Sequence, residues 1–374
     1  MKKYRDSQLD FTDRGWNTLY EVVDDPAFKT QSAESIYLNL IHQCRPVPFC
    51  DYLKRFLYRA ASLEGDFRTI PTETYQGILR AAFRETHTPA SFEEGSTKLS
   101  AASANWLSQR KASRATVLLL GFGLSLSLAE VNEFLLKGLH TEALRRTDPR
   151  ELLCAYCYDY GYTFPKFEKL QKRYEAADWS APADEEEAAL FQACRALREK
   201  EQTSDSPRFE VFMSLYEQVR ILLAKGYEPD EWKQEPARPE DFSPADLEAA
   251  LYEGIPRDAY DNLLPMKRSA LYAVFGEGRL SRKRLFSLLH RQTLPERRDL
   301  ITLNFYLWSQ KEKDRLSPRK RFTAFTEDTN RLLSACGFGE LYAAIPYECF
   351  LMMCLLTNDP LAVYTDVWER SYQE

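Results

Sequence analysis

The amino-acid sequence predicts an all-α protein, and three observations carry that prediction. Only 14 of the 374 residues are glycine, while 44% are hydrophobic, so the chain can bury a sizeable core and lacks the composition of a turn-rich β protein. Apolar residues recur at helical spacing in segment after segment. Short Ser, Thr, Gly or Asp-Pro stretches separate these segments, as is typical of helices joined by turns.

In the N-terminal half, prolines mark several helix boundaries. Pro46 and Pro48 separate the first two expected helices, while Pro71 and Pro89 flank the third. The expected helices are SAESIYLNLIHQ (32–43), FCDYLKRFLYRAASL (49–63), TETYQGILRAAFRE (72–85), SAASANWLSQR (100–110), SRATVLLLGFGL (113–124), LAEVNEFLLKGL (128–139) and PRELLCAYCYDYGY (149–162).

The C-terminal half has the same pattern. Glu185 to Glu187 fall in the first turn of an expected helix, where negative charge suits the helix dipole, and Ser243 is an expected N-cap. The expected helices are EEEAALFQACRALREK (185–200), RFEVFMSLYEQVRILLAKG (208–226), SPADLEAALYEG (243–254), LPMKRSALYAVFG (264–276), LSRKRLFSLLHRQ (280–292), ERRDLITLNFYLW (296–308), FTEDTNRLLSACG (325–337) and PYECFLMMCLL (346–356).

Two stretches of the chain match each other. KASRATVLLLGFGL (111–124) aligns without a gap with LPERRDLITLNFYL (294–307), and the match continues through two further helices with an insertion, SQKEKDRLSPRKRFT (309–323), in the second stretch. Chance similarity of two helices would rarely extend to their Pro, Glu, Asn and Arg positions, so we expect two diverged copies of one helical module. The matched pairs are Arg114 with Arg297, Phe122 with Phe305, Asn132 with Asn330, Pro149 with Pro346, Glu151 with Glu348, and Cys157 with Cys354.

Charge is distributed unevenly although the net charge is only −6. Residues 267–321 contain fifteen Lys or Arg against five acids, whereas 175–205 contain nine acids against three bases and 228–253 nine against two. This asymmetry indicates separate acidic and basic surfaces. The expected organisation is an N-terminal helical lobe (1–175, with copy one at about 90–170), an acidic, Pro-rich helical connector (176–242) and a C-terminal helical lobe (243–374, with copy two at about 279–374).

Each copy presents a short helix, a turn, a basic stretch and a longer apolar helix, within residues 91–126 and 280–307. This order resembles the lambda-repressor-type (Cro/repressor) helix-turn-helix domain, and more narrowly bacterial members whose DNA-reading helix leads into a G-K-R-x-P-S-R stretch and a helical extension with an E-x-x-N-x-L-L helix. The matching stretches are 109–114 and 292–297 for the basic motif, and 130–136 and 328–333 for the extension. The glycine that the family has after the reading helix is Ser108 in copy one and Arg291 in copy two.

The resemblance implies that a helix in each copy enters the major groove of double-stranded DNA, where Arg, Lys, Asn or Gln read base edges and nearby cations hold phosphates. Copy two is the better equipped, because alanines occupy much of the expected reading helix of copy one. The candidate residues of copy two are Arg279, Arg282, Lys283, Arg284, Arg291, Gln292, Arg297 and Arg298. Those of copy one are Lys98, Asn105, Gln109, Arg110, Lys111 and Arg114.

Other chemistry has weak support in the sequence. Cys154 and Cys157 are spaced like half of a zinc site, but no second pair follows at a suitable distance, and Cys157 aligns with Cys354, so small core residues explain both. The glycines of GFGL (121–124) are interpreted as packing residues, and the aromatic cluster of 156–167 as core. No nucleophile, phosphate-loop or dinucleotide motif appears. We therefore expect neither an enzyme, nor a cofactor, nor a metal, nor a small-molecule substrate.

The expected location is the cytoplasm, because no signal peptide or membrane-spanning segment is visible and the cysteines are interpreted as reduced thiols. The leading functional hypothesis is a non-enzymatic transcription regulator that contacts DNA through copy two. The alternative is a protein–protein adaptor, for example in a phage-defence or signalling assembly, that kept the fold and lost base reading. In either case the basic residues of copy two could also dock onto the acidic connector or a protein partner.

Overall fold

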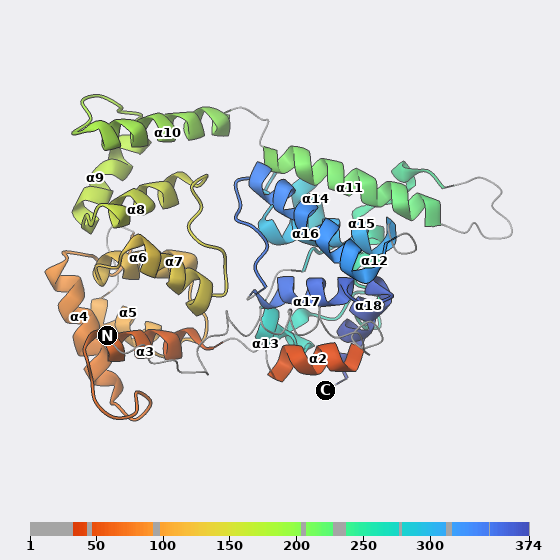
Figure 1. Cartoon of the computed structure of the whole chain (residues 1–374), viewed down its shortest axis with the longest axis horizontal. Coiled ribbons are helices and arrows are strands. Elements are labelled where there is room, and N and C mark those ends of the chain that lie inside the picture. Colours follow the sequence, from red (N-terminus) through yellow and green to blue (C-terminus); the bar gives the residue numbers. More distant parts are fainter. Residues whose placement is uncertain are drawn as a thin grey trace. The chain divides into compact units, whose positions relative to one another are not determined.

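The computed structural model describes residues 33–42, 47–92, 98–202, 207–226, 237–276, 279–311, 316–343 and 345–373. Within these ranges every regular element is a helix, and the extended pairing amounts to one isolated bridge between Arg257 and Leu263. The expected all-α class is confirmed. Of the described residues, 47–202 form one compact unit, called unit 1, while 33–42 and 207–373 form a second, unit 2 (Figure 1).

Unit 1 is built around α6, whose residues from Val117 to Gly123 are all buried. Helices α4, α7 and α8 pack directly against α6. The helices of this unit are α3 (Phe49–Ala60), α4 (Thr72–Glu85), α5 (Leu99–Trp106), α6 (Arg114–Gly123), α7 (Leu128–Glu133), the π-helical turn η2 (Phe134–Gly138), α8 (Pro149–Asp159), α9 (Phe164–Glu175) and α10 (Glu185–Gln202).

Unit 2 is centred on α15 and α17, and every residue of α17 is buried. Helix α11 lies along α15, and α2 packs on α17 and α18 (Figure 1). The elements are α2 (Ala33–His42), α11 (Pro207–Gly226), η3 (Pro239–Asp241), α12 (Pro244–Leu251), η4 (Met266–Arg268), α13 (Tyr272–Phe275), α14 (Arg282–Leu289), α15 (Arg297–Lys311), α16 (Pro318–Ala335), α17 (Pro346–Leu355) and α18 (Pro360–Arg370).

Two glycines of α6 allow its close packing. A Cβ atom at Gly123 would lie 2.0 Å from the ring of Phe83, and one at Gly121 would lie 2.8 Å from Cγ2 of Val131 and 2.9 Å from the Tyr158 ring. Such distances are far below van der Waals contact, so larger residues would displace the neighbouring helices. The interpretation of GFGL as a packing segment is confirmed.

The units contain helices in the same order at the aligned positions. Helices α5 and α14 each have eight residues, and each precedes a buried helix that begins at an aligned arginine, Arg114 or Arg297. Helices α8 and α17 both begin at a proline, and each is followed by another helix with proline in its first turn. These last two helices, α9 and α18, were not among the expected segments.

The stretch expected as a connector, 176–242, is divided between the units. Its two expected helices exist, but α10 packs on α8 in unit 1, and α11 packs on α15 in unit 2. Residues 203–206 and 227–236 lie outside the described part of the chain. The described helices of the stretch are therefore parts of the two cores, because their apolar faces are buried there.

Two further expectations were wrong in detail. Residues 264–276 form a short 3₁₀ turn and a single α-helical turn rather than one helix, since Pro265 precedes the first and Ser269 interrupts the segment. The helix expected over 325–337 begins earlier, since α16 starts at Pro318 and includes the end of the basic insertion. Residues 312–315 of the insertion lie outside the described residues.

Candidate nucleic-acid interface

Helix α14 is the expected reading helix of unit 2. Ser281 caps it, accepting a hydrogen bond from the backbone N–H of Arg284 on its side-chain oxygen, and Leu285 and Leu288 anchor its inner face. The opposite face is exposed at Arg282 and Lys283, and further along at Phe286, which is 50% exposed. The helix is therefore fixed at its start and along one side, with the other side open.

An exposed surface, here called the α14 surface, extends from this helix into the turn that follows it. His290 stacks on Phe286 with 3.9 Å between ring centroids, and Arg291 lies over the ring of Phe209 at 5.5 Å. The sequence has no acidic residue between Arg279 and Pro295. The α14 surface consists of Arg282, Lys283, Phe286, His290, Arg291, Gln292 and Leu294, all exposed.

Arg297, a candidate DNA contact, is buried in an ion pair instead. Its Nε lies 2.7 Å from Oε1 of Glu348, and its Nη2 lies 2.9 Å from Oε2. The guanidinium also donates to the backbone carbonyls of Gly339 and Glu340, and Oε2 of Glu348 accepts the backbone N–H of Tyr342. This set of bonds fixes the segment 339–342 against the start of α15.

Arg114 of unit 1 has the same partners at the aligned positions. Its guanidinium pairs with Glu151 at 2.5 and 2.7 Å and donates to the carbonyls of Glu142 and Ala143. Oε2 of Glu151 also accepts the backbone N–H of Arg145 at 2.7 Å. These bonds correspond one to one in the two networks, and Arg114 has one more, to Oγ1 of Thr141 at 3.3 Å. Neither arginine is available to a phosphate.

The aligned asparagines also have one role. Oδ1 of Asn132 accepts the backbone N–H of Leu144 at 2.9 Å, and Oδ1 of Asn330 accepts that of Leu341 at 2.8 Å. In sequence, each leucine directly follows the two residues whose carbonyls accept from the arginine. It directly precedes the residue whose backbone N–H donates to the glutamate. The asparagines, like the arginines and glutamates, hold the loop before α8 or α17 in place.

Three more candidate arginines of unit 2 are used within the fold. Arg284 pairs with Asp299 at 2.7 Å, Arg298 lies 3.8 Å over the ring of Tyr347, and Arg279 donates to the carbonyl of Leu264. Each side chain is at least partly buried, so these residues shape the scaffold behind the α14 surface.

In unit 1, the corresponding surface is less charged. Helix α5 exposes Ala101 and Asn105, Ser108 is exposed in the turn that follows, and the Asn105 amide donates to Gln109 Oε1 at 3.2 Å. The other candidates, Lys98, Arg110 and Lys111, are exposed on either side of the helix. The structure thus leaves cations beside α5 but none on its outer face.

The basic insertion contributes a buried arginine. Arg321 is 1% exposed and donates to the backbone carbonyls of Leu355, at 3.1 and 3.2 Å, and of Thr357. Burial lowers the pKa of its guanidinium, and the charge of Asp359 opposes that change. Arg321 therefore satisfies carbonyls at the end of α17, a role that the charge count of the insertion did not indicate.

The acidic segments mostly pair within their own unit. Glu187, which was expected only to favour the helix dipole, is 2% exposed and binds Lys166 at 2.5 Å and Arg173 at 2.9 Å. Among the candidate cations of unit 2, Arg279 approaches an acid of the 228–253 segment, with 3.5 Å to Glu248.

The cysteines of the C-x-x-C segment are core residues. Cys154 and Cys157 are fully buried, as is the aligned Cys354, and burial raises the pKa of the Cys157 thiol to about 12. Among the described residues, no group of three or more His, Cys, Asp or Glu is arranged to hold a metal ion. Within the same residues, no helix combines the length and apolar character needed to cross a membrane.

The nearby aromatic cluster is mostly core as well. Tyr158, Phe164 and Phe167 are buried around Phe122, while Tyr160 is 48% exposed at the edge.

Comparison with protein-family models, with curated proteins and with solved structures gives no match for this chain.

Proposed function

We propose that the chain contains two diverged copies of one repressor-type helical module. The support comes from the Arg114–Glu151 and Arg297–Glu348 networks, in which aligned residues bind aligned backbone groups. Two unrelated helical domains would share apolar spacing, but not the same arginine, glutamate and asparagine bonds to one loop.

The protein acts, in this proposal, as a non-enzymatic regulator that binds double-stranded DNA through the α14 surface. The observation that carries the proposal is the exposed pair Arg282 and Lys283 at the start of a short, capped helix, followed by exposed Arg291 and Gln292. Repressor-type proteins present the start of the reading helix to base edges in the major groove. Arg291 also has a φ of 54°, the left-handed conformation that glycine adopts easily, at the position where the family has glycine.

A matched pair of double variants tests this assignment by fluorescence anisotropy on a labelled random duplex. R282Q/K283Q removes two cations from the α14 surface, and K98Q/R110Q removes two exposed cations beside α5. We expect the first to weaken binding at least about tenfold at low salt and the second to have a much smaller effect. Equal losses in both variants would contradict a role specific to α14, and no binding by the wild type at low salt would contradict the DNA proposal.

A protein partner is the second candidate, and one observation favours it. Phe286 and Leu294 are 50% and 53% exposed on the same surface as the cations, and exposed apolar side chains rimmed by polar residues mark protein interaction sites. In that case F286S would abolish binding to a protein that the wild type binds. The control I221S, at an exposed apolar residue of α11, would leave this binding unchanged. DNA is favoured instead if R282Q/K283Q loses DNA affinity while F286S captures the same proteins as the wild type.

A further inference from the structure

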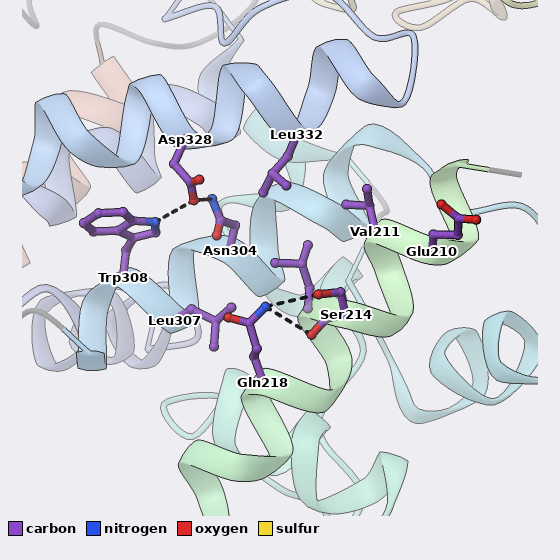
Figure 2. Close-up of a pocket in the computed structure, with 10 residues that line it drawn as sticks. Glu210, Val211, Ser214, Gln218, Asn304, Leu307, Trp308, Asp328 and Leu332 are labelled. Carbon is purple, nitrogen blue, oxygen red and sulfur yellow. Dashed lines mark hydrogen bonds between the residues drawn. The ribbon is translucent and has the colours of Figure 1, made fainter.

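A pocket in unit 2 lies between α11, α15 and α16, apart from the residues of the α14 surface (Figure 2). Its volume is about 470 Å³. Pockets that hold small molecules typically measure ~300–1,000 Å³ and combine apolar walls with a few polar groups. Here the apolar walls include Leu215 of α11, Leu307 of α15 and Leu332 of α16. The pocket therefore has the size and the mixed lining of a ligand site.

One wall carries a fixed polar group. Oδ2 of Asp328 accepts the Trp308 indole N–H at 3.0 Å and the Asn304 amide at 3.3 Å, and this amide also donates to Oγ1 of Thr329 at 3.0 Å. Asn304 is 2% exposed. The amide nitrogen faces a carboxylate and a hydroxyl, so the orientation of the Asn304 amide is determined. Its oxygen is the acceptor that these bonds do not use.

The Asn304 oxygen has no hydrogen-bond donor among the residues that the structure describes. Figure 2 shows the nitrogen of Asn304 turned to Asp328 and the oxygen on the other side of the amide. Asn304 lines the pocket, so a hydrogen-bond donor that enters the pocket can reach this oxygen without displacing another protein group. The pocket is the open space beside it.

The charges of the lining select the kind of donor. Asp328 contributes one carboxylate and Glu210, at the start of α11, another, while no Lys, Arg or His is among the lining residues. Arg331 reaches the other oxygen of Asp328 at 3.5 Å, but its side chain is 77% exposed, so it is well solvated and compensates this charge little. An anionic ligand would be repelled, and a cation with N–H donors would be attracted.

We propose that this pocket binds a small organic cation, an ammonium or guanidinium group attached to an apolar body. The cationic head donates to the Asn304 oxygen and to Asp328, and the body packs on the leucines. The site belongs to unit 2 alone: Gly121 is aligned with Asn304, and there Val131 and Tyr158 occupy the adjacent space.

Isothermal titration of the full-length protein with phenethylamine, and with phenylacetate as its anionic counterpart, tests the proposal. We expect saturable binding of phenethylamine and no binding of phenylacetate. E210Q and D328N each remove one pocket carboxylate, and E217Q removes an exposed carboxylate of α11 outside the lining. D328N should weaken binding at least about tenfold and E210Q about threefold, while E217Q should leave it unchanged.

Two results would overturn the proposal. The first is that neither phenethylamine, which carries an ammonium group, nor agmatine, which carries a guanidinium group, binds at millimolar concentration. The second is equal affinity for phenethylamine and phenylacetate, or an equal loss in E217Q and E210Q, which would indicate non-specific attraction to the acidic chain. E210Q is an exposed, conservative change, so its result does not depend on whether D328N disturbs the Trp308 and Asn304 contacts.

Discussion

Arg297 and Glu348 form a buried two-point ion pair, with 2.7 Å between Nε and Oε1 and 2.9 Å between Nη2 and Oε2. The arginine is the first residue of α15 and the glutamate lies in the first turn of α17. The pair therefore links two helices of the core and, through its backbone bonds, the loop that connects α16 to α17.

Truncation of either arginine should destabilise its unit strongly. R297A leaves the carboxylate of Glu348 buried without its partner, which typically destabilises a protein by about 3–5 kcal/mol. R114A should have a similar but somewhat smaller effect, because the Arg114 side chain is 17% exposed against 8% for Arg297. Urea unfolding of each variant measures this. R297K keeps the charge and loses the two-point geometry, and it should fall between the wild type and R297A. Losses below about 1 kcal/mol in both alanine variants would contradict the structural role.

The asparagines of the two loops should respond alike. N132A and N330A each remove the acceptor of one backbone N–H, and we expect a loss of about 1–2 kcal/mol in either case. N132D and N330D retain an oxygen at the same place and should recover part of the stability. Thermal unfolding of the four variants gives the comparison. A clear loss in one unit and none in the other would argue against equivalent roles.

Two glycine substitutions should have opposite signs. G123A places a methyl group 2.0 Å from the Phe83 ring and should destabilise the protein by about 1–3 kcal/mol or more. G77A lies in the middle of α4 with no atom within 4 Å of the added carbon, so it should stabilise the helix by up to about 1 kcal/mol. Chemical denaturation of both variants checks the prediction. A stabilising G123A would show that α6 is not closely packed there.

His140 should make stability depend on pH. Both ring nitrogens are buried, and burial lowers the pKa of the imidazole to about 4 from an ordinary value of 6.5. Below pH 6.5 the unfolded chain takes up a proton that the folded chain does not, so stability falls as the pH drops from about 6.5 to about 4, by about 2–3 kcal/mol. H140N suits the left-handed backbone there, φ 54°, and lacks the titration. If the variant and the wild type lose equal stability over this range, His140 is not the cause.

The all-α class and most helices could be predicted from the sequence, because apolar spacing and proline or serine boundaries are local signals. Helices α9 and α18 escaped prediction although each has proline in its first turn and α18 is capped by Asp359. Each follows a helix that begins at a proline, α8 or α17, so its own proline and the Asp359 cap of α18 are the local signals that could have found them.

Which basic side chains are buried in ion pairs and which are exposed could not be predicted from local patterns. Arg297 and Lys283 look alike in a charge count, yet one is buried against Glu348 and the other is exposed. Only the fold decides which cations meet a carboxylate far along the chain. The pocket beside Asn304 likewise depends on α11, which is distant in sequence from α15 and α16, and no local motif marks it.

The salt dependence of DNA binding tests the central functional claim most directly. The α14 surface presents three cations, Arg282, Lys283 and Arg291, so log K against log salt for a random duplex should have a slope of about −2.7, a loss of about fortyfold between 50 and 200 mM. R282Q/K283Q should reduce the slope by about 2. A slope that stays the same in this variant, or no measurable binding at 50 mM salt, would contradict the claim that this surface binds DNA.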